Sequence, residues 1–367
     1  MSKIKLIPGL FSLLRMSSDR KKRIAEADFN YVPDPIGDMA RQMHPDLLSL
    51  IVQDVRDENE SVKTYRLINS KSGDILPVFQ AGQYISVKLT IGDMHTSRAY
   101  TVSSAPYEAE GENGYIEITV RKKPNGFASA YIFENWKQGT GITATGPHGD
   151  FHYSPLRDST DIVALAGGTG ITPFRSMIKQ FAEEEPEMRL TLLYGCKNDC
   201  DVLFDAELDE IIKAYPGRFS RVNAYEAAPH GKYQGYLDSK FIAENIKNPG
   251  NKTFFICGPS VMYDFLKKEF VKVGALALRR KQTRYEVGGA PDDVTRRADW
   301  PKDVISKTVN LTVRIGNKSF SIPAHTTESL LLSIERAGLL LESRCRSGEC
   351  GICRSRLDSG DVYMILD

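Results

Sequence analysis

Alternating hydrophobic and polar positions are the strongest pattern in the chain between residues 47 and 155. In YISVKL (84–89) and YIEITV (115–120) every second residue is aliphatic, which is typical of strands with one buried face. Glycine and proline punctuate these segments, so we predict an antiparallel β-barrel over residues 47–155. The predicted inward residues are Ile85, Val87, Leu89, Ile116, Ile118 and Val120, and the residues between them, such as Ser86, are expected to face outward.

The pattern changes after residue 155. IVALA (162–166), LTLLYG (190–195) and TFFICG (253–258) are short, unbroken apolar runs, and a helical stretch follows each one. Continuous apolar strands are typical of parallel sheets that are buried on both faces. The alternation of strand and helix therefore predicts a doubly wound α/β domain over residues 156–278.

A third unit is predicted after a connecting segment. Residues 279–306 are rich in charge, glycine and proline and are expected to be an interdomain linker. TVNLTVRI and KSFSIP then predict a hairpin that turns at Gly316–Asn317. TTESLLLSIERAG predicts an amphipathic helix capped by Thr326 or Thr327 and ended at Gly338. We therefore place a partial α+β domain at residues 307–367.

Residues 1–46 form an N-terminal extension with a short apolar stretch, a basic patch and several prolines. One interpretation is a terminal segment packed over the first domain. The other is contact of residues 1–24 with a membrane surface or a partner, because basic residues flank the apolar stretch.

Composition excludes several classes of protein. The 367 residues are 41% hydrophobic and 26% charged, which is typical of a soluble multidomain protein, and the net charge of +1 gives no reason to expect nucleic acid as a partner. The chain has neither an apolar run of about 18 residues nor a signal peptide, so we predict a cytoplasmic protein without a transmembrane segment. Six unevenly spaced cysteines indicate metal binding rather than a disulfide framework.

Two loops of the α/β domain suggest a nucleotide site. GGTGITP (167–173) lies between a strand and a helix, where backbone N–H groups attract a pyrophosphate. Thr172 is the expected helix cap and Pro173 the first helical residue. CGPSVM (257–262) ends another parallel strand and is expected at the same sheet edge. Cys257 would then face a ligand, although a buried apolar role is the alternative.

A third segment, RAYTVSSAP (98–106), offers groups that suit a planar phosphorylated ligand. Arginine forms a bidentate fork for phosphate, an aromatic ring can stack on a flat ring, and hydroxyls can hydrogen-bond ring heteroatoms. These properties by themselves indicate no more than a polar strand edge.

CRSGECGIC (345–353) carries three cysteines in the spacing C-x4-C-x2-C, which is that of plant-type 2Fe-2S loops. Thiolate sulfur suits iron, and Gly348 and Gly351 allow the backbone to wrap a cluster. Zinc or free thiols are the alternatives. The printed sequence has no cysteine after Cys353, so we expect the fourth ligand beyond residue 367. Substitutes from the α/β domain, namely Cys196, Cys200 and Cys257, are not expected.

These motifs together resemble one family. RAYT resembles the R-x-Y-[ST] signature of the ferredoxin-NADP reductase superfamily, and FQAGQYISV (79–87), ITVRKKPNGFASAYI (118–132), GPHGDF (146–151), GGTGITP and CGPSVM follow the family order. With CRSGECGIC, residues 47–367 resemble the subgroup that carries a C-terminal plant-type ferredoxin domain, as in oxygenase reductases and hybrid-cluster-protein reductases.

The resemblance implies an FAD-binding barrel, an NAD-binding α/β domain and a 2Fe-2S domain of the β-grasp type. Arg98 would bind the flavin pyrophosphate, Tyr100 would stack on the isoalloxazine, and Thr101 would lie near the reactive flavin nitrogen. Cys257 would lie beside the nicotinamide, so Thr101 and Cys257 are the catalytic candidates. The implied cofactor-binding residues are Arg98, Tyr100, Thr101, Val120, Arg121, Gly126, Ala128, Ser129, Gly168, Thr169, Gly170, Thr172, Pro173, Gly258, Pro259 and Met262, and the metal ligands are Cys345, Cys350 and Cys353.

The implied function is an electron relay from NADH through FAD and a 2Fe-2S cluster to an external protein. FMN and NADPH stay open as alternatives, although Glu226 at a strand end would repel a 2'-phosphate whereas Lys197 would attract it. The acceptor would be a terminal oxygenase, a hybrid-cluster protein or another reductase. Four arginines around the cluster loop, Arg344, Arg346, Arg354 and Arg356, predict an acidic docking face on that partner. The alternative is an ordinary solvated loop that is rich in arginine.

Two other functions remain open from the sequence. One is a simple NADH:flavin diaphorase without a working cluster. The other is a nonenzymatic module that senses nucleotide or redox state, against which the intact RAYT segment argues.

Overall fold

The structure is a computed structural model, and its chain divides into two compact parts, residues 1–41 and residues 42–367. The second part contains the barrel, the α/β unit and the third unit. The structure describes residues 19–20, 22–23, 34–43, 45–71, 73–124, 126–227, 232–272, 283–287, 300–301, 303–304, 306–346, 348 and 350–364. Helix α2 (Pro35–Met43) lies in the N-terminal extension. Most of residues 1–24, for which contact with a membrane surface or a partner was one of two interpretations, lie outside the described residues. Within the described ranges, every helix is too short or too polar to span a membrane.

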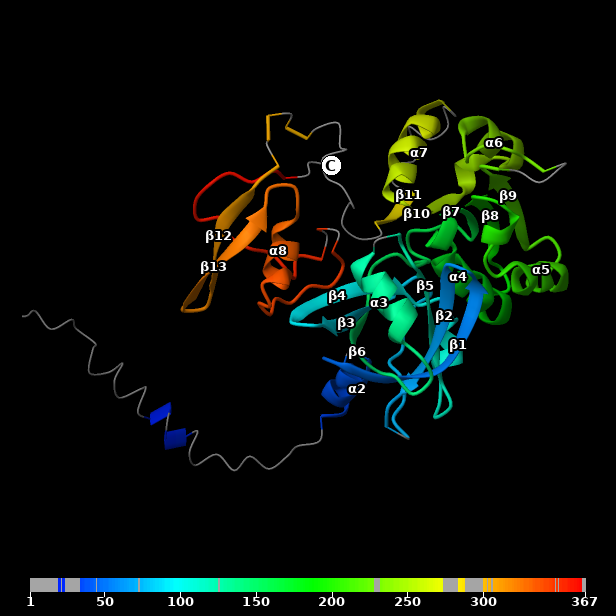
Figure 1. Cartoon of the computed structure of the whole chain (residues 1–367). Helices are drawn as coiled ribbons and strands as arrows, with labels where there is room; N and C mark the ends of the chain where they lie inside the picture. Colours follow the sequence, from blue (N-terminus) through cyan, green and yellow to red (C-terminus); the bar gives the residue numbers. More distant parts are fainter. Residues whose placement is uncertain are drawn as a thin grey trace, which may run out of the picture. The chain divides into compact units, whose positions relative to one another are not determined.

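The predicted antiparallel barrel is confirmed (Figure 1). Its six strands are β1 (Leu48–Asn59), β2 (Val62–Asn69), β3 (Tyr84–Ile91), β4 (Met94–Thr101), β5 (Ile116–Arg121) and β6 (Gly141–His148), in the order β4-β3-β6-β1-β2-β5. An antiparallel bridge between Val102 and Ile118 joins the two outer strands of this order. The short helix η1 (Pro106–Ala109) follows β4, and α3 (Phe127–Asn135) follows β5.

The predicted inward residues of the barrel are buried, but some of the expected outward residues are buried as well. Ser86 is 1% exposed, because the Arg344 segment of the third unit covers it, and its hydroxyl donates to the Arg344 carbonyl at 3.3 Å. Glu117 is 2% exposed, because Arg175 of the α/β unit contacts it. The outward faces of β3 and β5 are therefore interfaces with other parts of the chain.

The α/β unit contains a five-stranded parallel sheet, as its apolar runs predicted. Its strands are β7 (Asp161–Gly167), β8 (Arg189–Cys196), β9 (Phe219–Tyr225), β10 (Thr253–Gly258) and β11 (Thr283–Val287), in the order β11-β10-β7-β8-β9. The helices are α4 (Thr172–Glu184), α5 (Asp205–Ala214), α6 (Ser239–Asn245) and α7 (Ser260–Lys272), with short 3-10 turns η2 (Gly168–Ile171), η3 (Asp199–Asp201) and η4 (Pro249–Asn251).

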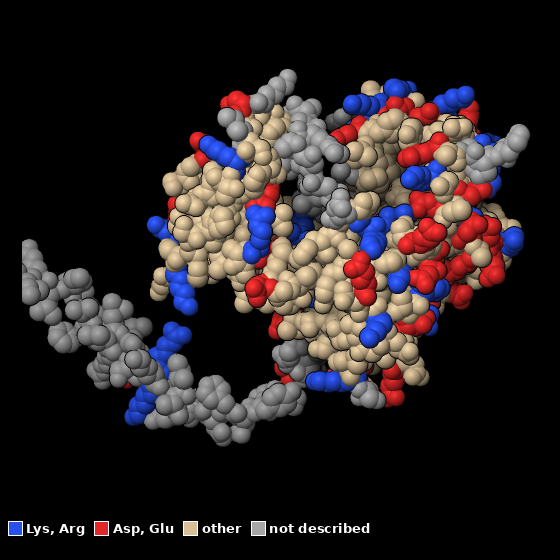
Figure 2. All heavy atoms as spheres, viewed as in Figure 1, with Lys and Arg blue, Asp and Glu red and all other residues tan. Residues whose placement is uncertain are grey.

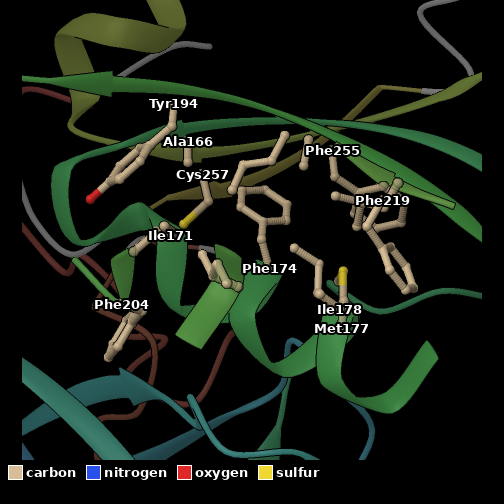
Figure 3. Close-up of a cluster of buried hydrophobic side chains, with 14 of the residues drawn as sticks. Ala166, Ile171, Phe174, Met177, Ile178, Tyr194, Phe204, Phe219, Phe255 and Cys257 are labelled. Carbon is tan, nitrogen blue, oxygen red and sulfur yellow. The ribbon is translucent and has the colours of Figure 1, made fainter. Parts of the chain in front are cut away.

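Alternate residues of the central strand β7 face opposite hydrophobic clusters. Ile162 and Ala164 pack with apolar residues of α4 and α5, whereas Val163 and Leu165 pack with those of α6 and α7. Figure 3 shows the first cluster, in which Phe174 and Met177 of α4 lie beneath the sheet. Helices on both faces make the sheet doubly wound, which confirms the predicted fold class.

Strand β11 lies within the segment that was predicted to be a linker. It pairs in parallel with β10, from Phe254 opposite Thr283 to Gly258 opposite Val287. Its sequence TRYEV is too polar to be recognised as a buried strand, and this edge position requires burial on fewer sides. Part of residues 279–306 therefore extends the sheet, and most of the remainder lies outside the described residues.

The third unit contains the predicted hairpin, β12 (Thr308–Ile315) and β13 (Lys318–His325), with Gly316 at φ +57° in the turn. Helix α8 (Leu330–Arg336) follows it. The expected cap at Thr326 or Thr327 is wrong: Ser329 is the N-cap, and its hydroxyl accepts from the Leu332 backbone N–H at 3.2 Å. The threonines instead lie in the turn between β13 and α8.

Candidate functional site

The two loops predicted to share one sheet edge are in contact. A Cβ added to Gly170 would lie 2.1 Å from the Cys257 carbonyl oxygen, so only glycine fits between the two strand ends. Gly168 has φ +53°, which favours glycine, and the Tyr194 hydroxyl donates to its carbonyl at 3.0 Å. A Cβ added to Gly167 would meet Met262 Sδ at 2.8 Å, next to Pro259. Backbone of the first loop therefore lies directly against the second.

The start of α4 differs by one residue from the prediction. Ile171 is the N-cap and provides no side-chain hydrogen bond, and Thr172 is the first helical residue rather than the cap. The Thr172 hydroxyl donates to the Thr169 carbonyl at 3.0 Å and so fixes the loop from within the helix. Pro173, which was expected as the first helical residue, is therefore the second. A helix N-terminus preceded by glycines retains the geometry that attracts a pyrophosphate.

The flavin candidates Arg98, Tyr100 and Thr101 lie at the end of β4, opposite Val87, Ile85 and Tyr84 of β3. Arg98 donates to Thr96 Oγ1 at 2.5 Å and to the Ser97 carbonyl at 2.7 Å. Burial and the nearby Arg346 lower the pKa of Arg98. Burial raises the pKa of Tyr100, which keeps its ring neutral, and the ring packs against the barrel core.

The end of β5 brings the barrel next to the nucleotide loop. Val120 is fully buried, and Arg121 forms an ion pair with Asp201 of the α/β unit at 2.7 Å. The Arg121 guanidinium also lies 4.0 Å from the position that a Cβ of Gly168 would take. Candidates from both domains therefore meet at this point.

Helix α3 begins directly after Gly126, which offers no side-chain cap. The Ser129 hydroxyl accepts from the Lys123 backbone N–H at 3.1 Å, and Ala128 is buried. A Cβ at Gly126 would lie 2.5 Å from Ser129 Oγ, so the turn is closed around glycine. An uncapped helix N-terminus in this position fits the phosphates of a flavin nucleotide.

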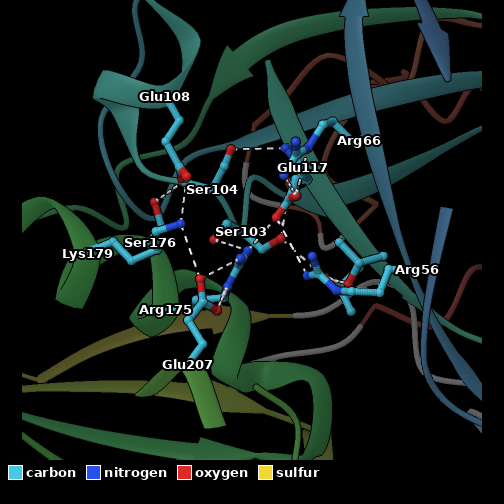
Figure 4. A network of polar contacts seen from close by, with 12 residues as sticks. Arg56, Arg66, Ser103, Ser104, Glu108, Glu117, Arg175, Ser176, Lys179 and Glu207 are labelled. Carbon is cyan, nitrogen blue, oxygen red and sulfur yellow. Dashed lines mark hydrogen bonds and ion pairs between the residues drawn. The ribbon is translucent and has the colours of Figure 1, made fainter. Parts of the chain in front are cut away.

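The sequence analysis missed a charged network between the barrel and α4, which is centred on Arg175 (Figure 4). Arg175 lies in PFRSMIKQF, where its neighbours Phe174, Ser176 and Met177 are all buried. The sequence offered one signal, a charged residue inside an apolar helical segment. Because such residues are rarely buried unless they are paired, it could have indicated a buried ion pair at Arg175.

The three cysteines of the third unit lie on one loop with different exposures. Cys345 is buried, Cys353 is intermediate and Cys350 is exposed, and the Cys350 backbone N–H donates to Cys345 Sγ at 3.4 Å. Positive φ angles at Gly348 and Gly351 curve the loop. Among the described residues, which exclude 347 and 349, no group of three metal-binding side chains is close enough to hold an ion. Thiolate chemistry, the N–H to sulfur bond and the glycine curvature nevertheless suit an iron-sulfur cluster.

The cysteine loop contacts the strands that carry the flavin candidates. Ser97 and Ser343 share a hydrogen bond of 2.6 Å, and Ser97 also donates to the Ser343 carbonyl at 3.0 Å. The Thr96 hydroxyl donates to Glu335 at 3.0 Å. Arg346, predicted as a surface docking residue, is instead 8% exposed and paired with Glu335, so that prediction is wrong for this arginine.

Three family models match successive parts of the chain. The oxidoreductase FAD-binding domain matches residues 49–153, the oxidoreductase NAD-binding domain matches 164–268, and the 2Fe-2S iron-sulfur cluster binding domain matches 313–367. Their order is that of the barrel, the α/β unit and the cysteine-bearing unit.

Individual proteins match the chain over all or part of these three domains. The glycine betaine monooxygenase reductase subunit of Chromohalobacter salexigens is 24% identical over 301 residues, which cover 79% of this chain and 80% of that protein. NADH-cytochrome b5 reductase 1 of Dictyostelium discoideum is 31% identical over 209 residues, or 56% of this chain and 70% of that protein. The solved structure of phthalate dioxygenase reductase matches with a TM-score of 0.64 and 23% identity, over 88% of this chain and 90% of that one.

The fold and the site thus define an NAD(P)H-dependent flavoprotein oxidoreductase with an iron-sulfur domain. The chain belongs to the ferredoxin-NADP reductase superfamily, in the subgroup that carries a C-terminal 2Fe-2S domain. It transfers electrons from NAD(P)H through FAD and 2Fe-2S to an external acceptor.

Proposed function

We propose that this protein is the NADH-dependent reductase component of a terminal oxygenase. When bound, FAD would supply the acceptor for two electrons as hydride, and 2Fe-2S would carry one electron at a time. Together they would convert one two-electron transfer into two one-electron transfers. One arrangement supports the proposal: Arg121 at the end of β5 lies beside the loop GGTGITP, while Ser97 on β4 bonds to Ser343, two residues before Cys345. The oxygenase is favoured because two of the relatives described above are named as reductases of oxygenases.

In this proposal each site residue has a defined task. Arg98 neutralises the flavin pyrophosphate, Tyr100 covers the ring and Thr101 hydrogen-bonds it. Gly168 and Gly170 let backbone N–H groups approach the nucleotide pyrophosphate. The side chains and backbone of the loop CGPSVM (257–262) line the nicotinamide pocket. The catalytic contacts are assigned to Thr101 and Cys257. The cluster ligands are Cys345, Cys350 and Cys353.

The preference for NADH follows from the charges at the ends of β8 and β9. The Glu226 backbone N–H donates to the Cys196 carbonyl at 3.0 Å, so the exposed Glu226 side chain lies beside the end of β8. Lys232, which would favour a 2'-phosphate, forms an ion pair with Asp199 at 2.8 Å. Lys197 remains as an exposed cation opposite Glu226. We expect a higher kcat/KM with NADH, and a shift toward NADPH in Glu226→Lys.

The docking of the acceptor is proposed for the exposed part of the cysteine loop, with Arg354 and Arg356 as its basic residues. Figure 2 shows acidic side chains gathered on the visible face of the α/β unit around α5, where an acidic partner would be repelled. The reduction rate of the partner should therefore fall as salt rises. Reduction of the partner that is independent of salt would contradict this docking mode.

The experiment is anaerobic reduction of the purified protein by NADH, followed by the flavin absorbance and by the EPR signal of a reduced 2Fe-2S cluster. We expect bleaching of the flavin, the EPR signal, and then reoxidation by a purified oxygenase component. Flavin bleaching without an EPR signal would instead indicate the diaphorase. A protein that turns over with neither natural nor artificial acceptors would be a binding module. Reoxidation by a hybrid-cluster protein but not by an oxygenase would replace the proposed acceptor.

A further inference from the structure

Helix α4 carries two functions on neighbouring turns. Its N-terminus follows the nucleotide loop, and one turn further on Arg175, Ser176 and Lys179 contact the barrel. Arg175 Nη1 donates to Glu117 of β5 at 2.8 Å and to the Ser103 carbonyl at 3.0 Å. Its Nε and Nη2 atoms donate to the two carboxylate oxygens of Glu207 on α5, at 2.5 and 2.9 Å.

The part of this network that faces the barrel is almost completely buried, whereas the side chain of Glu207 is 33% exposed. Arg175 and Glu117 are each 2% exposed, and Ser103 is fully buried. Figure 4 shows the guanidinium of Arg175 between the carboxylates of Glu117 and Glu207. Burial opposes the ionisation of Arg175, but its bonds to the two carboxylates more than compensate and raise its pKa. The guanidinium is therefore permanently charged and is neutralised from both domains.

Further contacts from α4 follow the same line onto the barrel. The Ser176 hydroxyl donates to the Ser104 carbonyl at 2.6 Å, and the Ser104 hydroxyl accepts from the Glu117 backbone N–H at 2.9 Å. Lys179 Nζ lies 2.7 Å from Glu108. The interface is thus a row of charge-assisted and backbone hydrogen bonds, which impose direction and not merely proximity.

The positions of these contacts link them to the chemistry. Arg175 follows Thr172 by less than one helical turn, and Ser103 comes two residues after Thr101. Glu117 lies on β5, the strand that ends with Val120 and Arg121. Arg175 therefore ties the segment that binds the nucleotide to both barrel segments that are assigned to the flavin.

We propose that Arg175 is a positioning residue for hydride transfer, which holds the nicotinamide half of the site in register with the flavin half through Glu117 and Ser103. The inference rests on the proposed function, in which NADH transfers hydride to the flavin. The guanidinium of Arg175 donates to Glu117, Ser103 and Glu207, so we assign it no contact with the reacting atoms. Interfaces between domains of one chain permit relative motion unless specific contacts prevent it. Because hydride transfer requires reacting atoms about 3–3.5 Å apart, a shift of 1 Å lowers the rate about 100-fold.

The test compares Arg175→Gln with Arg221→Gln in the full-length flavoprotein. Arg221 is a matched control, because its side chain is 9% exposed and pairs with Asp205 and Asp209 at 2.6 and 2.8 Å, all within the α/β unit. Anaerobic stopped-flow mixing with NADH gives the limiting rate of flavin reduction and the Kd for NADH separately. Deuterated NADH verifies that the limiting rate reports hydride transfer.

We expect Arg175→Gln to lower the limiting rate about 100-fold with little change in Kd, because the nucleotide contacts remain. Arg221→Gln should keep the limiting rate even if its thermal stability falls. Arg175→Lys keeps the charge but not the planar fork, and should recover part of the rate. It also takes the place of Arg175→Gln if that variant does not fold.

Equal limiting rates for the Arg175 variants and Arg221→Gln would overturn the proposal and leave Arg175 as a stabilising residue. A change confined to Kd would overturn it as well, because the defect would then be in binding. If NADH does not reduce the flavin of the unmodified protein, the proposed function itself is wrong. This outcome is distinguishable from a failure of the Arg175 proposal, in which the unmodified protein is reduced normally.

Discussion

Glu335 on α8 provides a sharp test of how the cysteine loop is held. Its side chain is 1% exposed and forms ion pairs with Arg346, which is 8% exposed. The Thr96 hydroxyl of the barrel donates to the same carboxylate at 3.0 Å. In Glu335→Ala the guanidinium of Arg346 would stay buried without its carboxylate, close to the cation of Arg98.

The size of the effect follows from this burial. Removing one partner of a buried ion pair costs about 3–5 kcal/mol, because the other charge remains unpaired. Small domains have unfolding free energies near the low end of about 5–15 kcal/mol. The third unit should therefore lose most of its stability, whereas the barrel and the α/β unit keep their own cores.

The assay is urea unfolding followed by two separate signals, cluster absorbance for the third unit and flavin fluorescence for the barrel. The free energy of unfolding falls by about 1–2 kcal/mol per M urea. In Glu335→Ala the midpoint of the cluster transition should therefore move by roughly 1.5 to 5 M to lower urea, while the midpoint of the flavin transition stays unchanged. Asp358→Ala is the control, since Asp358 pairs with Arg356 at side-chain exposures of 43% and 87%. Such an exposed pair contributes at most about 1 kcal/mol. Equal shifts in the two variants would refute the reasoning.

Three further predictions concern the site itself. Gly170→Ala should abolish NADH-driven flavin reduction while flavin stays bound, because the added Cβ would lie 2.1 Å from the Cys257 carbonyl oxygen; normal stopped-flow reduction would contradict this. Arg98→Leu should purify without flavin and regain only a small fraction of its absorbance when FAD is added, and a fully yellow variant would disprove the phosphate role. Burial opposes the ionisation of Glu117, but Arg175 and other arginines outweigh this effect and lower the pKa of Glu117 in the folded protein. The ionised carboxylate therefore stabilises the fold at pH values above its ordinary pKa of 4.5. This stabilisation is lost as the pH falls through the lower pKa of the folded state. Thermal unfolding should therefore show Glu117→Gln as less stable than the parent at neutral pH, with a shallower loss of Tm below pH 4.5, and parallel Tm curves would exclude this linkage.

The fold could be predicted from the sequence where one pattern determines one environment. The apolar runs of β7, β8 and β10 are buried on both faces, and the alternation in β3 and β5 sets their core-facing residues correctly. Strand β11 could not be found this way, because an edge strand with the sequence TRYEV has neither pattern. Caps were predicted less well, since Ser329 competes with two nearby threonines and the tertiary contacts decide among them.

The candidate site shows the same division. The glycine loops could be placed together because parallel strands end at one sheet edge, and the contact of Gly170 with Cys257 follows from that rule. The Arg175 network could not be predicted, because its partners Glu117 and Glu207 come from different domains and no local spacing relates them. Arg346 was predicted to be exposed for a similar reason, because only the fold brings it into contact with Glu335.

Strand β5 shows why these hidden contacts matter for function. Its inward residues Ile116 and Ile118 build the barrel core, and its outward Glu117 holds Arg175 of the nucleotide domain. A polar residue on the second face therefore takes part in the contact between the barrel and the nucleotide domain. Because both faces of this strand make contacts, a shift of Arg175 would be passed on to Val120 and Arg121 at the end of the strand. In the proposed function, β5 is therefore the element that couples stability to hydride transfer.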